Sequence, residues 1–294
     1  MSSVVVVGAA GFVGAEVVRA YRSAGHEVLA AGRVAGLGID VTTPNAEALR
    51  SIVNDKVDQV VVCAQLGLSA GQWIVELVDG PRWLVCSSAQ LNNATPAPST
   101  EMQIDRERIA LARGATVLRP TMMYGHGRDA NISTLIRRAQ RFGIAAEIAG
   151  GRALVQPIHV DDVVAAMTAV LTTPALVAAS GRGASNVPYS LGGSEAVPVH
   201  ELLGDIAELL GRNVKTIPIS RTALRLAERF APLVGLRPAK LRRLTEDKTV
   251  DNTVLSRATG WAPIAHAIRL EQAVQEVTAP TIKFDENVTT SKAA

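Results

Sequence analysis

The stretch VVVVGAAGFVGAEVV, residues Val4–Val18, decides the fold. Four consecutive valines predict a strand buried on both faces, and a glycine-rich turn leads from it directly into a helical pattern. This order of strand, turn and helix is the layout of a dinucleotide-binding unit. Gly8 permits the tight turn, Gly11 lets the backbone approach a pyrophosphate, and Gly14 lets the helix pack closely on the sheet. The glycine pattern alone would also fit a simple strand–helix turn.

The start of that helix is expected to hold the phosphates of a dinucleotide. A helix N-terminus presents unpaired N–H groups and a partial positive charge to an anion. Besides the three glycines, we therefore expect contacts from Ala10, Phe12 and Val13.

Arg33 decides which dinucleotide we expect. It follows the next predicted strand, residues 27–31, where such folds contact the adenosine ribose. An acidic residue there would hold the 2′-hydroxyl of NAD, whereas a guanidinium suits a 2′-phosphate. We predict NADP in preference to NAD; the alternative is an ordinary solvated arginine. Asp40 and Val41 follow a further short strand, where Asp40 is placed to meet the adenine amino group.

The rest of the chain predicts an α/β fold with a doubly wound parallel (Rossmann) sheet and a smaller C-terminal substrate-binding region. Hydrophobic residues make up 48% of the 294 residues and aromatic residues 3%, a composition typical of such sheets. We expect a dinucleotide-binding domain over residues 1–180, a C-terminal region over 181–280 and a flexible tail over 281–294. The further predicted strands are Gln59–Ala64, Trp83–Ser87, Val117–Pro120 and Pro157–Val160.

Ligands of such sheets lie beyond the carboxyl ends of the strands. This rule adds further residues to the predicted cofactor contacts: Ala64, Ser87, Arg119, Pro120 and Thr121.

Other features exclude several classes of protein. Cys63 and Cys86 lie in apolar runs, so we expect buried thiols in a reducing compartment. The histidines are scattered along the sequence, so we expect no metal site. The uncharged run Val163–Gly181 is long enough to span a bilayer, but we interpret it as a buried helix that ends near Pro174. We therefore expect a soluble, cytoplasmic protein without a transmembrane span.

Several short motifs together resemble the extended and atypical short-chain dehydrogenase/reductases, the NAD-dependent epimerase/dehydratase family. The likeness covers about residues 4–275, and the QPIHVDD form also resembles members similar to an accessory subunit of respiratory complex I. The motifs are the glycine turn, Asp40-Val41, Ser87-Ser88, LRPTMMYG (Leu118–Gly125), QPIHVDD (Gln156–Asp162) and ATGWAP (Ala258–Pro263).

The resemblance implies a nicotinamide cofactor across the sheet and a serine, a tyrosine and a lysine for the chemistry. Ser88 matches the serine position, but Ala89–Leu118, where the tyrosine and lysine should lie, contains neither. An unperturbed tyrosine has a pKa of about 10, so the family pattern needs the lysine to lower it. The polar candidates in the interval are Glu101, Asp105, Arg106, Glu107, Arg108 and Arg113.

We expect Ser88 to position the substrate and Tyr124 or a carboxylate near Asp105 to move the proton. The simpler interpretation of Tyr124 is an aromatic side chain packed within a loop. The simpler interpretation of His126 is a solvated side chain. His159 and Asp161 match the family's HVDD motif, whose expected role is structural.

Two functions remain open. The first is an NADP-dependent oxidoreductase or epimerase that acts on a nucleotide-sugar-like or other small carbonyl or hydroxyl substrate without the usual Tyr/Lys pair. The second is a catalytically inert dinucleotide-binding module: a sensor, an assembly factor or a complex subunit. The segment Arg212–Lys248 carries ten Lys/Arg and three Asp/Glu, which suits a phosphorylated substrate or an acidic partner. We expect no nucleic acid as partner, and a homodimer is compatible with the sequence.

Overall fold

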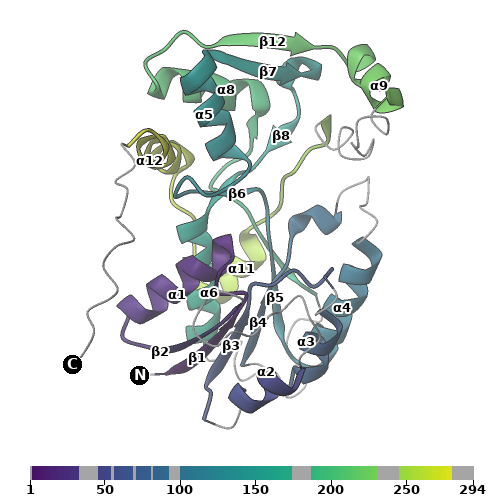
Figure 1. The fold of residues 1–294 in the computed structure, drawn as a ribbon, viewed down its shortest axis with the longest axis vertical. Coiled ribbons are helices and arrows are strands. Elements are labelled where there is room, and N and C mark those ends of the chain that lie inside the picture. The colour runs from purple at the N-terminus through teal and green to yellow at the C-terminus, as the bar shows by residue number, and fades with distance from the viewer. Residues whose placement is uncertain are drawn as a thin grey trace, which may run out of the picture.

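A six-stranded parallel sheet forms the centre of the protein, with the strand order β10-β5-β4-β3-β1-β2 (Figure 1). The computed structural model describes residues 2–32, 46–53, 56–68, 71–80, 82–92, 100–173, 187–230 and 245–279. The predicted doubly wound parallel sheet is confirmed, because the chain starts inside the sheet at β1 and extends it in both directions. The strands are β1 (Ser3–Val7), β2 (Glu27–Ala31), β3 (Gln59–Val62), β4 (Trp83–Cys86), β5 (Thr116–Pro120) and β10 (Tyr189–Leu191).

The valines of β1 are divided between two hydrophobic cores, one on each face of the sheet. Val4 and Val6 point to one face and Val5 and Val7 to the other, as the period of two along a strand requires. All four are fully buried, which explains why this strand is apolar throughout.

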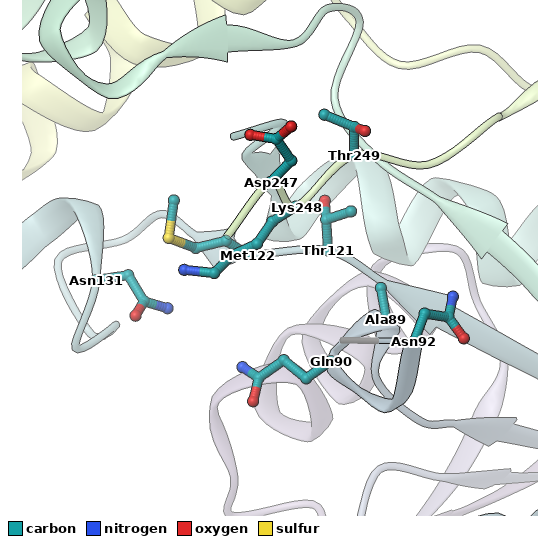
Figure 2. A pocket seen from close by; sticks show the side chains of 9 residues that line it. All are labelled: Ala89, Gln90, Asn92, Thr121, Met122, Asn131, Asp247, Lys248 and Thr249. Atoms are coloured by element: carbon teal, nitrogen blue, oxygen red, sulfur yellow. The ribbon is translucent and has the colours of Figure 1, made fainter. Parts of the chain in front are cut away.

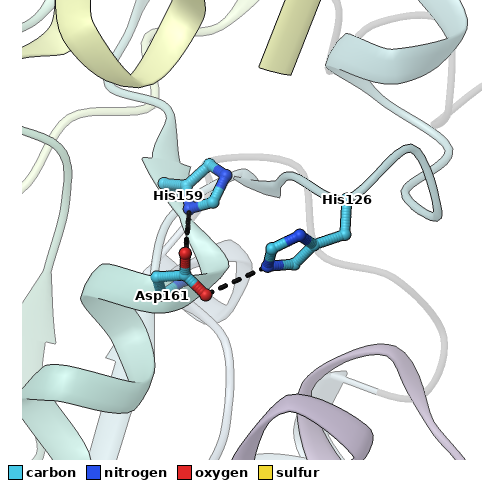
Figure 3. A group of neighbouring side chains, drawn as sticks. All are labelled: His126, His159 and Asp161. Carbon is cyan, nitrogen blue, oxygen red and sulfur yellow. Dashed lines mark hydrogen bonds and ion pairs between the residues drawn. The ribbon is translucent and has the colours of Figure 1, made fainter. Parts of the chain in front are cut away.

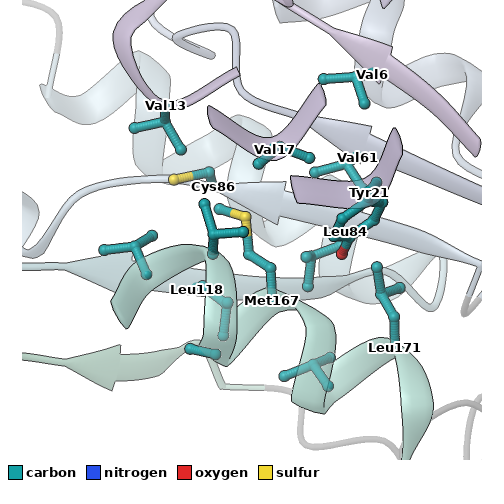
Figure 4. Packing of buried hydrophobic residues seen from close by; sticks show 14 of the residues in the cluster. Val6, Val13, Val17, Tyr21, Val61, Leu84, Cys86, Leu118, Met167 and Leu171 are labelled. Carbon is teal, nitrogen blue, oxygen red and sulfur yellow. The ribbon is translucent and has the colours of Figure 1, made fainter. Parts of the chain in front are cut away.

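Helices cover both faces. The first core lies under α1, α6 and α11, where Met167 packs among Val17, Leu84 and Leu118 (Figure 4). The second core lies under α2, α3 and α4. The helices are α1 (Phe12–Ser23), α2 (Ala46–Ile52), α3 (Gly71–Leu77), η1 (Ala89–Asn92), α4 (Thr100–Ala112), α6 (Val160–Thr172) and α11 (Thr253–Thr259).

A second group of elements lies beyond the carboxyl ends of the sheet strands (Figure 1). Its core is formed by apolar residues of α5, α8 and α12, including Ile136, Ile206 and Leu270. Strand β7 pairs in parallel with β12, and β8 pairs antiparallel with β11. The elements are β6 (Met123–Tyr124), α5 (Ile132–Phe142), β7 (Ile144–Ile148), η2 (Ala149–Gly151), β8 (Leu154–Val155), β9 (Ile158–His159), β11 (Val197–Pro198), α8 (Val199–Leu209), β12 (Lys215–Ile219), α9 (Arg221–Phe230) and α12 (His266–Thr278).

Three details differ from the sequence predictions. The run Pro157–Val160 was expected in the main sheet, but only Ile158–His159 is a strand, and it pairs with β6. Helix α6 starts at Val160 and leaves this strand too short to extend the sheet; β10 takes the edge position beside β5 instead. The helical spacing of Leu202, Leu203, Ile206, Leu209 and Leu210 predicts one buried face of α8, but Leu209 is 39% exposed in the last turn of that helix.

The boundary predicted at residue 180 stays a prediction. Helix α5, β7 and β8 precede it in sequence and lie with α8 and β12 (Figure 1), whereas β10 follows it and belongs to the sheet. The chain therefore passes between the two parts several times. The predicted tail, residues 281–294, lies outside the described residues.

The apolar run that begins at Val163 lies in α6, which ends at Thr172, close to the expected position. Its buried face packs against α1 and the sheet. Within the described part of the chain, every helix is too short or too polar to cross a bilayer.

Candidate functional site

The glycine turn between β1 and α1 is built as the sequence predicts. Gly8 has a φ of +84°, which L side chains rarely adopt, and a Cβ there would lie 2.8 Å from the backbone nitrogen of Ala64. A Cβ on Gly14 would lie 2.2 Å from the carbonyl oxygen of Gly8. Both positions therefore require glycine, since the backbones of the turn, of α1 and of the β3 end approach each other closely.

The first residues of α1 are arranged to accept an anion. Ala10 and Gly11 are exposed, and Phe12 is half-buried. A Cβ on Gly11 would have the Gly8 carbonyl oxygen as its near contact, at 3.1 Å, so the space above the turn is open. Val13 is buried and lines the neighbouring pocket. The N–H groups of this first turn are thus available to a phosphate.

Three of the predicted cofactor contacts lie outside the described residues: Arg33, Asp40 and Val41. Strand β2 itself ends at Ala31, as predicted, directly beside the turn, where Gly8 N donates to Ala31 O over 2.8 Å. The preference for NADP therefore stays a prediction.

A pocket of about 240 Å³ opens beyond the ends of β3 and β4, next to the glycine turn. Ser87 and Ser88, at the end of β4, both line it, as does Gln103 of α4. The full lining is Val13, Cys63, Gln65, Cys86, Ser87, Ser88, Gln90, Leu91, Thr100, Gln103 and Met123. The predicted position of the site at the carboxyl ends of the strands is therefore matched by a cavity.

A buried polar network lies behind this pocket, where the family pattern would place its tyrosine and lysine. The Ser87 hydroxyl donates to Glu107 Oε1 and accepts from Gln103 Nε2 over 3.1 Å. Glu107, 1% exposed, also accepts from Arg119 Nε at 2.9 Å and Nη2 at 2.5 Å. Helix α4 therefore contributes a buried amide and a buried carboxylate to the site.

Arg119, predicted as a cofactor contact, is held within this network. Its Nη1 donates to Asn92 Oδ1 over 2.7 Å, and its other two donor groups contact Glu107. The side chain is 15% exposed. The guanidinium therefore balances the charge of Glu107 and ties β5 to η1. Pro120, the next residue, is buried where β5 pairs with β10.

Ser88 and Asp105 do not come together. Ser88 lies on the pocket, where its Oγ accepts from Gln90 N over 3.2 Å. Asp105 lies on the outer face of α4, 68% exposed, in an ion pair of 3.2 Å with Arg108. The helical period explains this, because Gln103 and Glu107 are four residues apart on the inner face and Asp105 lies between them in sequence.

Tyr124 also does not face the pocket. It is 1% exposed within the core of the second group of elements, and its ring lies edge-on against that of His159 with the centroids 5.3 Å apart. Burial, with a smaller effect from the carboxylate of Asp162, raises the pKa of Tyr124 far above its usual value. The structure therefore favours the simpler interpretation of Tyr124, a packed aromatic side chain, over a role in moving a proton.

A second pocket, of about 130 Å³, adjoins the first and shares Gln90 with it. In Figure 2, Gln90 of η1, Asn131 before α5 and Lys248 extend around the same open space. Thr121 lines this pocket and donates its hydroxyl proton to Gln156 O. The full lining is Ala89, Gln90, Asn92, Thr121, Met122, Asn131, Asp247, Lys248 and Thr249. Residues 247–249 are thus the part of the predicted C-terminal region that lines this pocket.

Gln103 lines the pocket although no sequence motif marks it, and Glu107 is only one of several polar residues that the sequence offers in this interval. Their spacing of four residues on a helix is the signal that could have found them, because it places both on one face. No comparable signal marks residues 247–249 as pocket residues. They reach the pocket because this segment pairs with β8, where Lys248 N donates to Leu154 O over 2.7 Å.

Two histidines, His126 and His159, lie beside Asp161 at the start of α6 (Figure 3). His126 was expected to be solvated, but its Nε2 lies 3.0 Å from Asp161 Oδ1 and its Nδ1 lies 3.2 Å from Glu276 Oε1. These two partners raise the pKa of His126 to about 10, and His126 lowers that of Asp161 to about 2. The cap of α6 is His159, whose Nδ1 accepts from Asp161 N over 3.3 Å, and not an aspartate.

Comparison with known proteins agrees with this architecture. Residues 4–76, from β1 to α3, match the NAD dependent epimerase/dehydratase family. No curated protein matches the chain.

Solved structures of similar fold cover nearly the whole chain. A UDP-glucose 4-epimerase from Thermus thermophilus in complex with NAD is 17% identical, with a TM-score of 0.71 over 94% of this chain and 99% of that one. A dTDP-glucose 4,6-dehydratase from Bacillus anthracis, also with NAD, is 15% identical, with a TM-score of 0.69 over 94% and 96%. RMD from Pseudomonas aeruginosa, complexed with NADPH, is 17% identical, with a TM-score of 0.69 over 94% and 97%.

The chain therefore has the same fold as these epimerase and dehydratase structures. The resemblance predicted from the motifs is confirmed, most directly over the dinucleotide-binding half of the sheet.

Proposed function

We propose that this chain is an NADP(H)-binding oxidoreductase or epimerase that acts on a nucleotide-sugar-like or other small carbonyl or hydroxyl substrate. The observation that carries the proposal is the pocket between the glycine turn and α4, which places Ser87, Ser88 and Gln103 at the carboxyl ends of the central strands. Similar structures bind NAD or NADPH, and two are named for enzymes of UDP-glucose or dTDP-glucose.

The residues present fit a dinucleotide. The glycine turn has no room for a Cβ at Gly8 or Gly14, and the first turn of α1 is open above Gly11. In the proposal, the N–H groups of Phe12 and Val13 hold the pyrophosphate, because that of Gly11 already donates to Gly8 O over 2.9 Å. Arg33 contacts a 2′-phosphate of the adenosine ribose. A bound nicotinamide would supply the capacity to accept or donate a hydride.

The polar groups at the reacting end differ from the family pattern. A serine hydroxyl has one donor and two acceptor sites. Ser87 uses its donor on Glu107 and one acceptor on Gln103, so one acceptor site remains beside the pocket. Together with Ser88, this group can hold a substrate hydroxyl without a tyrosine. Asp105 and Tyr124 have no part in the proposal, because both point away from the pocket.

The second pocket is the proposed place for the remainder of the substrate. It adjoins the first at Gln90, and Asn131 and Lys248 offer hydrogen-bond donors around it (Figure 2). An ammonium group and a side-chain amide suit a phosphate or a sugar hydroxyl. The first pocket lies beside the glycine turn and the second beside residues 247–249. A substrate that extends through both would have its reacting carbon near Ser87 and Ser88.

The inert module remains a second candidate because of one observation. The carboxylate on α4 that takes the place of the missing pair is already engaged by Arg119 and Ser87. Such a closed network stabilises a fold whether or not a bound dinucleotide reacts. Assembly with another protein through the basic segment would then be the function, as the sequence also allows.

One experiment separates the two functions. NADPH and NADH are titrated against the tryptophan fluorescence of the full chain. Turnover is then followed in two ways: cofactor oxidation with a panel of carbonyl compounds, and product formation from nucleotide sugars by chromatography, since an epimerase converts its substrate without net cofactor oxidation. Tight NADPH binding with turnover that Ser88→Ala reduces supports the enzyme. Tight NADPH binding without turnover on any compound supports the inert module, and a failure to bind either cofactor contradicts both.

A further inference from the structure

Two histidines and an aspartate bring their metal-binding atoms together at the start of α6 (Figure 3). His126 Nε2 lies 3.0 Å from Asp161 Oδ1, and His159 Nδ1 lies 3.5 Å from Asp161 Oδ2. All three candidate donor atoms lie within 4.8 Å of one another. Bonds to a tetrahedral Zn²⁺ separate the ligand atoms by about 3.3 Å, so only small movements are needed to enclose an ion.

Glu276 of α12 faces both rings. Its Oε1 lies 3.2 Å from His126 Nδ1 and its Oε2 lies 3.8 Å from His159 Nε2. One carboxylate thus faces the nitrogen of each ring that does not point at Asp161. Histidines that bind metals usually direct their second nitrogen at a carboxylate in this way, which fixes the ring and raises its basicity.

The burial of the two histidines differs in a way that suits a site with an entry path. The His159 side chain is 0% exposed, and its Nε2 makes no hydrogen bond within the described residues, since Glu276 is too distant at 3.8 Å. The His126 and Asp161 side chains are 24% and 26% exposed, so an ion can reach them from solvent. The site thus has two accessible ligands and a buried one, His159, whose Nδ1 would exchange its hydrogen bond from Asp161 N, 3.3 Å long, for the bond to the ion.

We propose that His126, His159 and Asp161 form a binding site for one divalent transition-metal ion, with Zn²⁺ as the best fit. Two imidazoles and a carboxylate favour Zn²⁺, Co²⁺ or Ni²⁺ over Mg²⁺ and Ca²⁺, which prefer oxygen ligands. Glu16, whose Oε2 lies 3.7 Å from His126 Nε2, is placed to give a fourth ligand; water is the alternative. This site is separate from both pockets and independent of the proposed reaction.

The charges around the site set the conditions for binding. Arg19 and Arg269 contact Asp161 at 3.2 and 3.6 Å, while Glu16 and Glu276 add negative charge. A metal ion binds histidine nitrogens only in their unprotonated form, so its binding releases any proton that they carry. A bound ion would link the loop at His126 to α6 and, through Glu276, to α12.

The test is a titration of the full chain, freed of metal with EDTA and dialysed, with Zn²⁺ in a calorimeter. Co²⁺ serves as a spectroscopic probe of tetrahedral nitrogen and oxygen ligands. His126→Asn is the main variant, because His126 has a φ of +52° and asparagine tolerates that backbone better than most residues. His200→Asn is the matched control, since His200 lies on the surface, 47% exposed, beside Glu201.

We expect one Zn²⁺ per chain with release of a proton, lost in His126→Asn and kept in His200→Asn. Glu276→Gln leaves the ligands in place and should weaken binding about 10- to 100-fold, which guards against a folding defect in the first variant. Absence of Zn²⁺ binding by the unmodified chain overturns the proposal. So does binding that His126→Asn and Glu276→Gln leave unchanged, or that His200→Asn removes.

Discussion

The Ser87 hydroxyl at the end of β4 donates a hydrogen bond to the buried carboxylate of Glu107 on α4. These two residues join the pocket beside the glycine turn to the ion pair between Glu107 and Arg119, whose nearest atoms are 2.5 Å apart. Replacing Glu107 with glutamine would leave Arg119 without its counter-charge at a site that is largely closed to water. We expect a loss of about 3–5 kcal/mol in the free energy of unfolding, measured by urea denaturation.

Asp105→Asn is the control for that prediction, because Asp105 lies on the exposed face of the same helix. Its substitution should change stability by less than about 0.5 kcal/mol. Equal effects of the two substitutions would show that the buried pair has no special role.

The glycine turn gives a second prediction. A Cβ at position 14 would lie 2.2 Å from the carbonyl oxygen of Gly8, so Gly14→Ala must push α1 away from the turn. We expect NADPH affinity to fall at least about tenfold and stability to fall by about 1–3 kcal/mol. Gly204→Ala, in α8 with no atom within 4 Å of the new Cβ, should instead stabilise the chain by about 0.4–1 kcal/mol.

The choice between cofactors gives a third prediction. If Arg33 contacts the 2′-phosphate of NADP, Arg33→Asp should reverse the preference between NADPH and NADH, because a carboxylate repels that phosphate and accepts the ribose hydroxyl. Fluorescence titration with both cofactors measures the ratio of their dissociation constants. An unchanged ratio would refute the role of Arg33.

The pH dependence of stability gives a fourth prediction for the metal-free chain in EDTA. The pKa of His126 is raised from 6.5 to about 10, so its stabilising effect is complete below pH 6.5 and is lost as the pH rises toward 10. The pKa of Asp161 is lowered from 3.8 to about 2, so its effect is lost as the pH falls through that range. The urea midpoint should therefore be highest between about pH 4 and 6.5, and His126→Asn should flatten its alkaline side.

The run of four valines and the glycine spacing that follows it determined the dinucleotide-binding half of the fold. These signals are local: a strand buried on both faces needs apolar residues throughout, and Gly8 and Gly14 have no room for a side chain. A parallel, doubly wound sheet could also be inferred, because strands that alternate with helices leave few topologies. Which strand forms its edge could not be inferred, since β10 takes the place expected for residues 157–160. The absence of tyrosine and lysine from residues 89–118 was also visible in the sequence alone.

Tertiary structure alone decided which of the candidate side chains face the pocket. Glu107 turns inward while Asp105 turns outward because one helix face packs on the sheet, and packing around His159 buries Tyr124. Likewise, residues 247–249 reach the second pocket through backbone pairing with β8, and His126 meets Asp161 across separate segments. Contacts between residues distant in sequence depend on how the elements pack, and no local pattern of residue types records that packing.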